Sequence, residues 1–261
     1  MPTVHTNGIN MYYEAAGQGE PLLLLHGLGS QSEDWAFQFP AFSQHYRVIA
    51  PDIRGHGRSD KPRGPYSVSM MADDILGMLD ALAIESTHIV GLSMGGMIAF
   101  QMAVDHPERV RSMVIVNSGP SLVPRTIREW LALQQRLLLA QLFSPARSGE
   151  FISRRLFPKP EQAAMREQLV ERWSANDPGA YRAAMRAIAG WSVLDRIDTI
   201  RCPTLVISGD RDYLPADAKR AYTERIPGAR LVVIEDSGHA TPIDQAEQFN
   251  KTVLEFLGGV G

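Results

Sequence analysis

The chain has 261 residues, of which 44% are hydrophobic and 21% charged, a composition typical of a folded protein with a sizeable core. Its formal net charge of -3 gives no reason to expect nucleic-acid or anionic-membrane partners. No run approaches the roughly 20 apolar residues of a membrane span, and the first residues carry no secretory signal. The single cysteine, Cys202, excludes an intrachain disulfide. These features together predict a cytoplasmic protein without nucleic-acid or membrane partners.

Short apolar runs alternate with helical patterns along most of the chain, which is typical of βαβ units and a mostly parallel sheet. The unbroken apolar run at residues 22–25 predicts a strand covered on both faces. The other predicted strands are residues 47–50, 88–91, 113–116, 204–208 and 231–234, with residues 11–14 as an antiparallel edge. The predicted helices are residues 69–82, 94–105, 217–225 and 245–256. The sequence therefore predicts an α/β fold.

Residues 121–195 break this alternation, because they contain no predicted strand and have the pattern of three or four helices rich in Leu, Ala and Arg. One interpretation is a plain helical extension of the core. We favour the other, a lid over the carboxyl ends of the strands, because open α/β sheets bind ligands there and long insertions are usually functional. The predicted organisation is a core of residues 1–120 and 196–261 with a helical cap of residues 121–195.

The strongest motif is Gly91-Leu92-Ser93-Met94-Gly95, which matches the pattern G-x-S-x-G. It follows one predicted strand and begins a predicted helix, the context in which this pattern carries a nucleophilic serine. Side chains at Gly91 and Gly95 would collide with the sharply turning backbone. We expect the Ser93 hydroxyl at a helix N-terminus, where backbone N–H groups favour developing negative charge. The alternative, a chance match beside a helix cap, explains the flanking strand and helix less well.

A second glycine-rich turn, Leu25-His26-Gly27-Leu28-Gly29, follows the apolar strand at residues 22–25. Such a turn lets a backbone N–H point toward the nucleophile and, with the N–H of the residue after the serine, form an oxyanion hole. The alternative is a plain glycine turn after a strand. We interpret His26 as a structural residue that orients the turn.

The catalytic base and acid are expected after the serine, in the order serine, acid, histidine. Of the seven histidines, only His239 lies after the last predicted strand. The segment Ser208-Gly209-Asp210-Arg211-Asp212 offers two acids. We favour Asp212, which lies farther out on the loop and can turn toward His239, and interpret Asp210 as bonding the backbone of its own turn.

Taken together, these residues resemble the α/β-hydrolase superfamily over nearly the whole chain. The segment from Pro51 to Asp60 resembles the one that follows the fourth strand in many members, and Cys202-Pro203-Thr204-Leu205-Val206 resembles their entry to the strand before the acid. The resemblance implies an α/β-hydrolase fold, with a mostly parallel central sheet, flanking helices and an inserted helical lid. Within the superfamily, residues 91–98 look most like the nucleophile turn of the 3-oxoadipate enol-lactonases and related esterases.

The resemblance also implies roles for individual residues. Ser93 resembles the nucleophile, Asp212 the acid and His239 the base, while the backbone N–H groups of Leu28 and Met94 resemble the oxyanion hole. The implied reaction is attack on a carbonyl, formation of an acyl-enzyme and hydrolysis by water. No metal and no organic cofactor is implied. The expected partner is a small, partly apolar ester or lactone, and the oligomeric state stays open.

Departures from subfamily patterns rank the alternatives. Ser93 stands where haloalkane dehalogenases and related epoxide hydrolases carry an aspartate, and Leu28 where cofactor-free haloperoxidases often carry an aromatic residue. Carbon–carbon bond hydrolases often have a tryptophan after the histidine and an asparagine before the serine, where this chain has Ala240 and Leu92. Two alternatives to an ester or lactone hydrolase stay open: a carbon–carbon bond (diketone) hydrolase, and a catalytically silent ligand receptor on the same fold.

Overall fold

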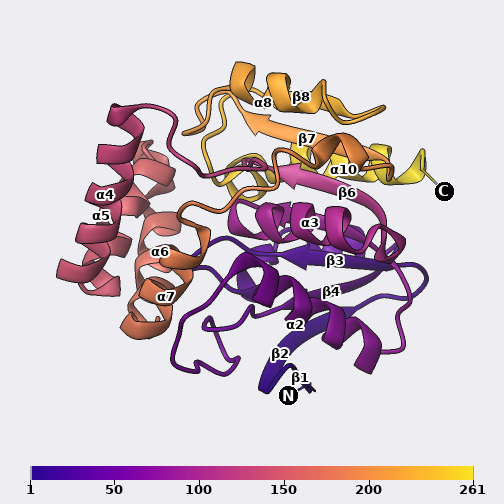
Figure 1. Cartoon of the computed structure of the whole chain (residues 1–261), viewed down its shortest axis with the longest axis horizontal. Helices are drawn as coiled ribbons and strands as arrows, with labels where there is room; N and C mark the ends of the chain where they lie inside the picture. The colour runs from indigo at the N-terminus through magenta and orange to yellow at the C-terminus, as the bar shows by residue number, and fades with distance from the viewer. Residues whose placement is uncertain (1, 261) are drawn as a thin grey trace.

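The computed structural model of the protein describes residues 2–260. An eight-stranded sheet with the order β1-β2-β4-β3-β5-β6-β7-β8 runs through the molecule (Figure 1). Strand β2 is antiparallel to β1 and to β4, and the remaining neighbours are parallel. The predicted α/β class is therefore confirmed. The strands are β1 (Thr3–Thr6), β2 (Ile9–Ala16), β3 (Pro21–Leu25), β4 (Arg47–Pro51), β5 (Thr87–Leu92), β6 (Val110–Val116), β7 (Thr204–Gly209) and β8 (Arg230–Ile234).

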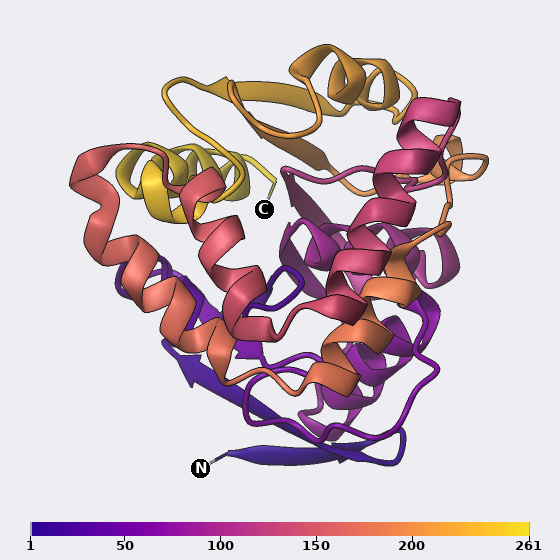
Figure 2. The same cartoon turned by 90° about the vertical axis from the view of Figure 1, so that its left-hand side faces the viewer.

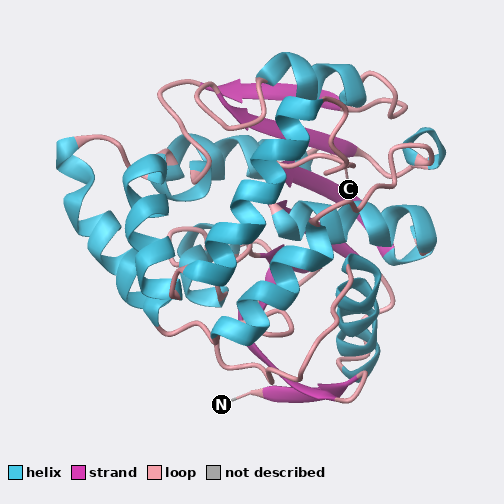
Figure 3. Ribbon diagram, turned by 60° about the vertical axis from the view of Figure 1, so that its left-hand side comes forward, coloured by secondary structure: helices cyan, strands magenta, loops and turns pink. Residues whose placement is uncertain are grey.

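Each central strand contributes to two hydrophobic cores, one on each face of the sheet. In β3, Leu23 and Leu25 pack into one core while Leu22 and Leu24 pack into the other, because successive side chains of a strand point to opposite faces. Helices α2 (Val68–Ala81) and α3 (Met94–Asp105) cover the first face, and α10 (Ala246–Gly258) covers the second (Figure 3). The unbroken apolar run at residues 22–25 thus reflects burial on both faces.

The remaining helices of the sheet layer are short. They are α1 (Phe39–Phe42), α8 (Ala216–Thr223) and α9 (Thr241–Asp244), with 3-10 turns at Ser32–Trp35, Pro107–Arg109 and Ile197–Thr199. A further 3-10 turn, Pro160–Gln162, lies between β6 and β7. Helix α3 begins and ends at the residues predicted from the sequence. Within the described chain, no helix is both long enough and apolar enough to cross a membrane.

The antiparallel strand predicted at residues 11–14 is longer than expected and does not form the edge of the sheet. Strand β1 occupies the edge and pairs with β2 through a hairpin whose two-residue turn is Asn7-Gly8. Both turn residues have positive φ angles, 43° and 75°, as hairpin turns of this length require. The Asn-Gly pair was the sequence signal for this hairpin, and it also places His5 in a strand.

Between β6 and β7 the chain forms the helical segment, which we define as residues 127–188. Three of its helices begin at side-chain caps, because Thr126, Ser144 and Asp177 each accept a hydrogen bond from a backbone N–H of the first turn. The segment gathers at the end of the sheet toward which the parallel strands point, as Figures 1 and 2 show. Its helices are α4 (Ile127–Leu142), α5 (Pro145–Leu156), α6 (Ala163–Ser174) and α7 (Pro178–Ile188).

Candidate active site

Ser93 lies in a strained turn between β5 and α3. Its φ and ψ angles are 53° and -111°, a conformation that a residue with a Cβ rarely adopts. The turn is possible only with glycines beside it. A Cβ on Gly95 would lie 2.1 Å from the carbonyl oxygen of Leu25, and one on Gly91 would lie 2.5 Å from that of Gly95. The G-x-S-x-G motif therefore has the strand–turn–helix geometry expected from the sequence.

Hydrogen bonds with the last residue of β6 and with the loop that follows it hold this turn in place. The Ser93 N–H donates to the carbonyl of Val116 at 2.9 Å, and the Ser118 hydroxyl donates to the Ser93 carbonyl at 2.6 Å. The Ser93 side chain borders a cavity. Both the N–H and the carbonyl of Ser93 are thus hydrogen-bonded, which fixes the backbone that carries the hydroxyl.

The turn after β3 lies directly against the serine. A Cβ on Gly27 would lie 3.5 Å from the Cβ of Ser93. The His26 ring fixes this turn: its Nδ1–H donates to the carbonyl of Gly27 at 2.8 Å, and its Nε2 accepts from the N–H of Ile53 at 2.9 Å. An Nε2 that accepts must be unprotonated, and burial lowers the pKa of His26, so the ring is neutral. His26 thus has the structural place expected of it.

The two backbone N–H groups predicted as oxyanion donors belong to residues beside Ser93. Leu28 borders the same cavity as Ser93. Met94 is the first residue of α3, and the first N–H groups of a helix have no acceptor within the helix. The structure brings both residues to the serine, and their catalytic role stays a prediction.

His239 and Asp212 form a hydrogen-bonded pair. The Nδ1 of His239, on the loop after β8, lies 2.5 Å from Oδ1 of Asp212, on the loop after β7. Burial of the Asp212 carboxylate acts to raise its pKa, but the hydrogen bond and charge of His239, together with Lys219, outweigh it and lower the pKa. His239 borders the same cavity as Ser93, so the two loops place the predicted base, with the predicted acid bonded to it, on that cavity.

Asp210, the alternative acid, has a different contact from the one expected. Its Oδ1 accepts the N–H of Ser237 at 2.8 Å, rather than a backbone group of its own turn. The two loops run close together, since a Cβ on Gly209 would lie 2.4 Å from the carbonyl oxygen of Gly238. Asp210 therefore ties the loop after β7 to the loop that carries His239.

Two polar residues near this pair were missed in the sequence. Asn117, at the end of β6, has a positive φ of 45° and donates its amide to the carbonyls of Gly238 and His239 at 3.1 and 2.9 Å. Lys219, on α8, is fully buried and lies 2.5 Å from Oδ2 of Asp212. Lys219 shares the buried face of α8 with Tyr222 and Thr223, and a lysine at such a helical position was the available signal.

Tyr213 covers one face of the His239 ring. The two rings are stacked, with centroids 4.5 Å apart and an interplanar angle of 22°. The guanidinium of Arg155, from α5 of the helical segment, lies 4.3 Å from the centroid of the Tyr213 ring. The helical segment is thus connected to His239 through Arg155 and Tyr213.

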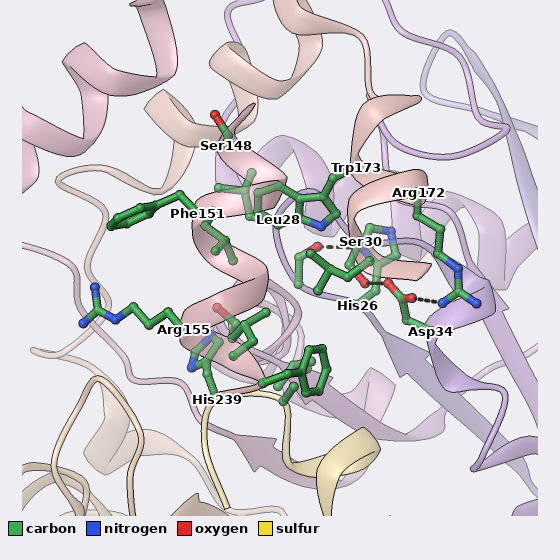
Figure 4. A pocket seen from close by; sticks show the side chains of 18 of the residues that line it. His26, Leu28, Ser30, Asp34, Ser148, Phe151, Arg155, Arg172, Trp173 and His239 are labelled. Atoms are coloured by element: carbon green, nitrogen blue, oxygen red, sulfur yellow. Dashed lines mark hydrogen bonds and ion pairs between the residues drawn. The ribbon is translucent and has the colours of Figure 1, made fainter. Parts of the chain in front are cut away.

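A cavity of about 990 Å³ lies between the sheet and the helical segment. Figure 4 shows His239 and Arg155 on one side of it and the ion pair of Arg172 with Asp34 on another. Within residues 2–260, no cluster of three or more His, Cys, Asp or Glu side chains is arranged to hold a metal ion. Most of the lining is apolar, and its large side chains from the helical segment include Leu139, Phe143, Phe151, Phe157, Trp173, Tyr181 and Met185.

A family profile described as alpha/beta hydrolase fold matches residues 20–246. The match spans most of the chain and includes the serine turn and both loops of the pair. The protein belongs to the α/β-hydrolase superfamily.

Relatives and solved structures of this α/β hydrolase cover most or all of its length. A protein of Azorhizobium caulinodans, provisionally named the carbamate hydrolase RutD, is 32% identical over 100% of this chain and 99% of its own. The 2-hydroxymuconate semialdehyde hydrolase of Pseudomonas putida is 36% identical over 92% of this chain and 88% of its own. The crystal structure of the enol-lactonase from Burkholderia xenovorans LB400 superposes with a TM-score of 0.91, at 28% identity, covering 98% of this chain and all of that one. The protein is thus a hydrolase of this superfamily, as the sequence motifs predicted.

Proposed function

We propose that this α/β hydrolase is a serine hydrolase that cleaves a carboxylic ester or lactone of a small, partly apolar molecule through an acyl-enzyme. The observation that carries the proposal is the pairing of His239 with Asp212 on a cavity that Ser93 also borders. Ser93 and His239 both border this cavity, and Asp212 bonds His239, so side chains of three chemically suited types come from three separate loops. A nucleophile, a base and a group that orients the base are the requirements of this chemistry.

Acylation begins when the Ser93 hydroxyl attacks the substrate carbonyl carbon. The His239 Nε2 accepts the hydroxyl proton, and the Asp212 carboxylate accepts the Nδ1–H and stabilises the resulting imidazolium. The negative charge on the carbonyl oxygen is stabilised by the backbone N–H groups of Leu28 and Met94. The leaving alkoxide takes the proton from His239 as the tetrahedral intermediate collapses to the acyl-enzyme.

Deacylation repeats these steps with water. His239 removes a proton from water, the hydroxide attacks the acyl carbonyl, and Ser93 regains its proton from the imidazolium as the acid leaves. In a lactone the leaving hydroxyl stays on the same molecule, so a single product is released.

The cavity supports a small, partly apolar substrate. We propose that residues 121–195 act as its lid, because apolar side chains from α4 to α7 line it opposite the serine turn. A volume of about 990 Å³ falls at the upper end of the range for small-molecule sites, so it suits an acyl chain or ring rather than a polymer.

Carbon–carbon bond hydrolysis is the second candidate. It is favoured by the 36% identity with a relative named a semialdehyde hydrolase, since a semialdehyde acid contains no ester to cleave. Ser93 would attack a ketone carbonyl in place of an ester carbonyl, and His239 would again accept its proton. A silent receptor is disfavoured, because ligand binding alone requires no His239–Asp212 pair beside a serine.

The test is hydrolysis of a panel of short-chain para-nitrophenyl esters, lactones, carbamates and vinylogous diketones by the native protein, Ser93→Ala and Ser174→Ala. Ser174 lies on the exposed side of α6 and serves as the matched control. We expect ester or lactone turnover that is lost in Ser93→Ala and kept in Ser174→Ala. Turnover that survives in Ser93→Ala would refute the nucleophile, and turnover of the diketone alone would favour the second candidate.

A further inference from the structure

Lys219 is a fully buried lysine whose ammonium group lies beside the Asp212 carboxylate. It lies on α8, with no exposed surface, and its side chain reaches under the loop after β7. Lysine is among the residue types least often buried, and a buried cation is costly unless it is paired and hydrogen-bonded. The position therefore calls for an explanation beyond helix packing.

The surroundings of Lys219 match an ammonium ion. Its Nζ lies 2.5 Å from Oδ2 of Asp212, 2.7 Å from the Ser208 hydroxyl and 3.1 Å from Oδ1 of Asn117. An ammonium group carries three protons, and three acceptors surround this one, whereas a neutral amine would leave one acceptor unbonded. Burial lowers the pKa of Lys219, the charge and hydrogen bond of Asp212 oppose that change, and the three acceptors match the ammonium form.

The two carboxylate oxygens of Asp212 bond different side chains, Lys219 and His239. Oδ2 bonds Lys219 and Oδ1 bonds His239. Across residues 2–260, these are the two groups that hydrogen-bond the carboxylate. The hydrogen bond from Lys219 therefore fixes the orientation of the Asp212 carboxylate, and the carboxylate in turn orients the His239 ring.

We propose that Lys219 is a positioning residue for catalysis. It holds Asp212 toward His239 and, through its positive charge, weakens the electrostatic attraction between Asp212 and the His239 imidazolium. This inference rests on the proposed serine-hydrolase function. The Lys219 ammonium bonds the carboxylate oxygen opposite to the one that bonds His239, so its charge repels the imidazolium and offsets part of the attraction that Asp212 exerts on that cation.

Asp244 is another ionisable group near His239 and Asp212, and it has hydrogen-bond partners of its own. Asp244 accepts the N–H of Gly238 at 2.8 Å and the Ser237 hydroxyl at 2.9 Å. Burial raises the pKa of Asp244, and the Gly238 and Ser237 hydrogen bonds oppose that rise. The groups that face His239 and Asp212 from neighbouring elements are Tyr213 and Asp210 after β7, Arg136 on α4, Arg155 on α5, Tyr222 on α8 and Asp244 on α9.

The experiment is an NMR titration of the His239 ring in the native protein, Lys219→Met, Lys219→Gln and Lys219→Arg. His239→Gln identifies the ring resonance by its disappearance. We expect the titration midpoint to rise by roughly one pH unit in Lys219→Met and Lys219→Gln, and to stay near the native value in Lys219→Arg, which keeps the charge. Lys251→Met, which removes a charge from an exposed side chain of α10, is the control and should leave the midpoint unchanged.

An unchanged or lower midpoint in whichever uncharged variant folds would overturn the inference. Lys219→Gln retains hydrogen-bonding capacity, so it is available if Lys219→Met does not fold. When kcat/KM for an ester is measured against pH, the midpoint of its fall at acidic pH should move in the same direction as the NMR midpoint. A purely structural lysine would lower kcat at every pH without moving that midpoint.

The titration separates this inference from the proposed function, because it needs no turnover. If Ser93→Ala keeps its activity, the proposed nucleophile fails whatever the NMR result. If Ser93→Ala is inactive and the His239 midpoint does not move in the Lys219 variants, the proposed function stands and the role of Lys219 fails.

Discussion

The phenol ring of Tyr213 stacks on the imidazole of His239, with centroids 4.5 Å apart and an angle of 22° between the ring planes. Tyr213 is the residue after Asp212, so one loop supplies both the hydrogen-bond partner of the ring and the surface against which it stacks. A ring held at its edge and on its face keeps few alternative rotamers. The loop after β7 thus restricts His239 in two directions.

Replacing Tyr213 with alanine should therefore lower kcat/KM for an ester by up to roughly tenfold, since an aromatic pair contributes about 0.5–1.5 kcal/mol. Tyr213→Phe keeps the stack and should stay near the native value. Steady-state kinetics of the three proteins check this. Equal losses in both variants would instead point to the hydroxyl.

Asp212 and Asp210 can be told apart by isosteric substitution. Asp212→Asn should lower kcat by about 10³–10⁴-fold, because an amide neither stabilises the imidazolium nor selects the right tautomer. Asp210→Asn keeps an oxygen that can accept the Ser237 N–H and should cost less than about tenfold. Kinetics at pH 7.5 measure both. A larger loss in Asp210→Asn would exchange the two assignments.

Gly95→Ala should destabilise the fold by about 2–3 kcal/mol, because its Cβ would lie 2.1 Å from the carbonyl oxygen of Leu25 and the backbone must shift. Gly258→Ala is the matched control, since a Cβ there meets no atom within 4 Å. Urea unfolding followed by circular dichroism gives both free energies of unfolding. Near-native stability of Gly95→Ala would contradict the tight turn.

Acid should destabilise the protein through its buried histidines. Burial lowers the pKa of His56 from the ordinary 6.5 to about 3, and burial also lowers that of His26. Between pH 6.5 and 3 the unfolded chain therefore binds protons that the folded His56 does not, so stability is present above pH 6.5 and is lost as the pH falls. One such group contributes a slope of about 1.4 kcal/mol per pH unit in that window.

The measurement is the free energy of unfolding between pH 5 and 6.5 for the native protein, His56→Gln and His45→Gln. In His56→Gln the free energy of unfolding should change less steeply with pH, because one fewer proton is taken up on unfolding. His45 is exposed, and its replacement should leave the slope unchanged. An unaltered slope in His56→Gln would show that His56 is protonated in the folded state.

Much of the core followed from periodicity. The run at residues 22–25 is buried on both faces, and helix α3 has its predicted bounds, because strand and helix patterns there agree with the tertiary packing. The position of β2 did not follow, since residues 11–14 alternate as an edge strand does. Pairing with β1 depends on the Asn7-Gly8 turn, which a search for apolar runs passes over.

The sequence by itself determined the residues with chemical capacity: Ser93 in its glycine turn, His239 after the last strand, and two acids after β7. Local rules suffice there, because a strand followed by glycines and a helix has few conformations. Only the tertiary structure decided which acid meets the histidine, and that Asn117, Tyr213 and Lys219 surround the pair. His239 and Asp212 are 27 residues apart in the chain, and Asn117 and His239 are 122 residues apart, so no local pattern encodes these contacts. A buried ammonium in particular is stable only where three acceptors from separate elements converge.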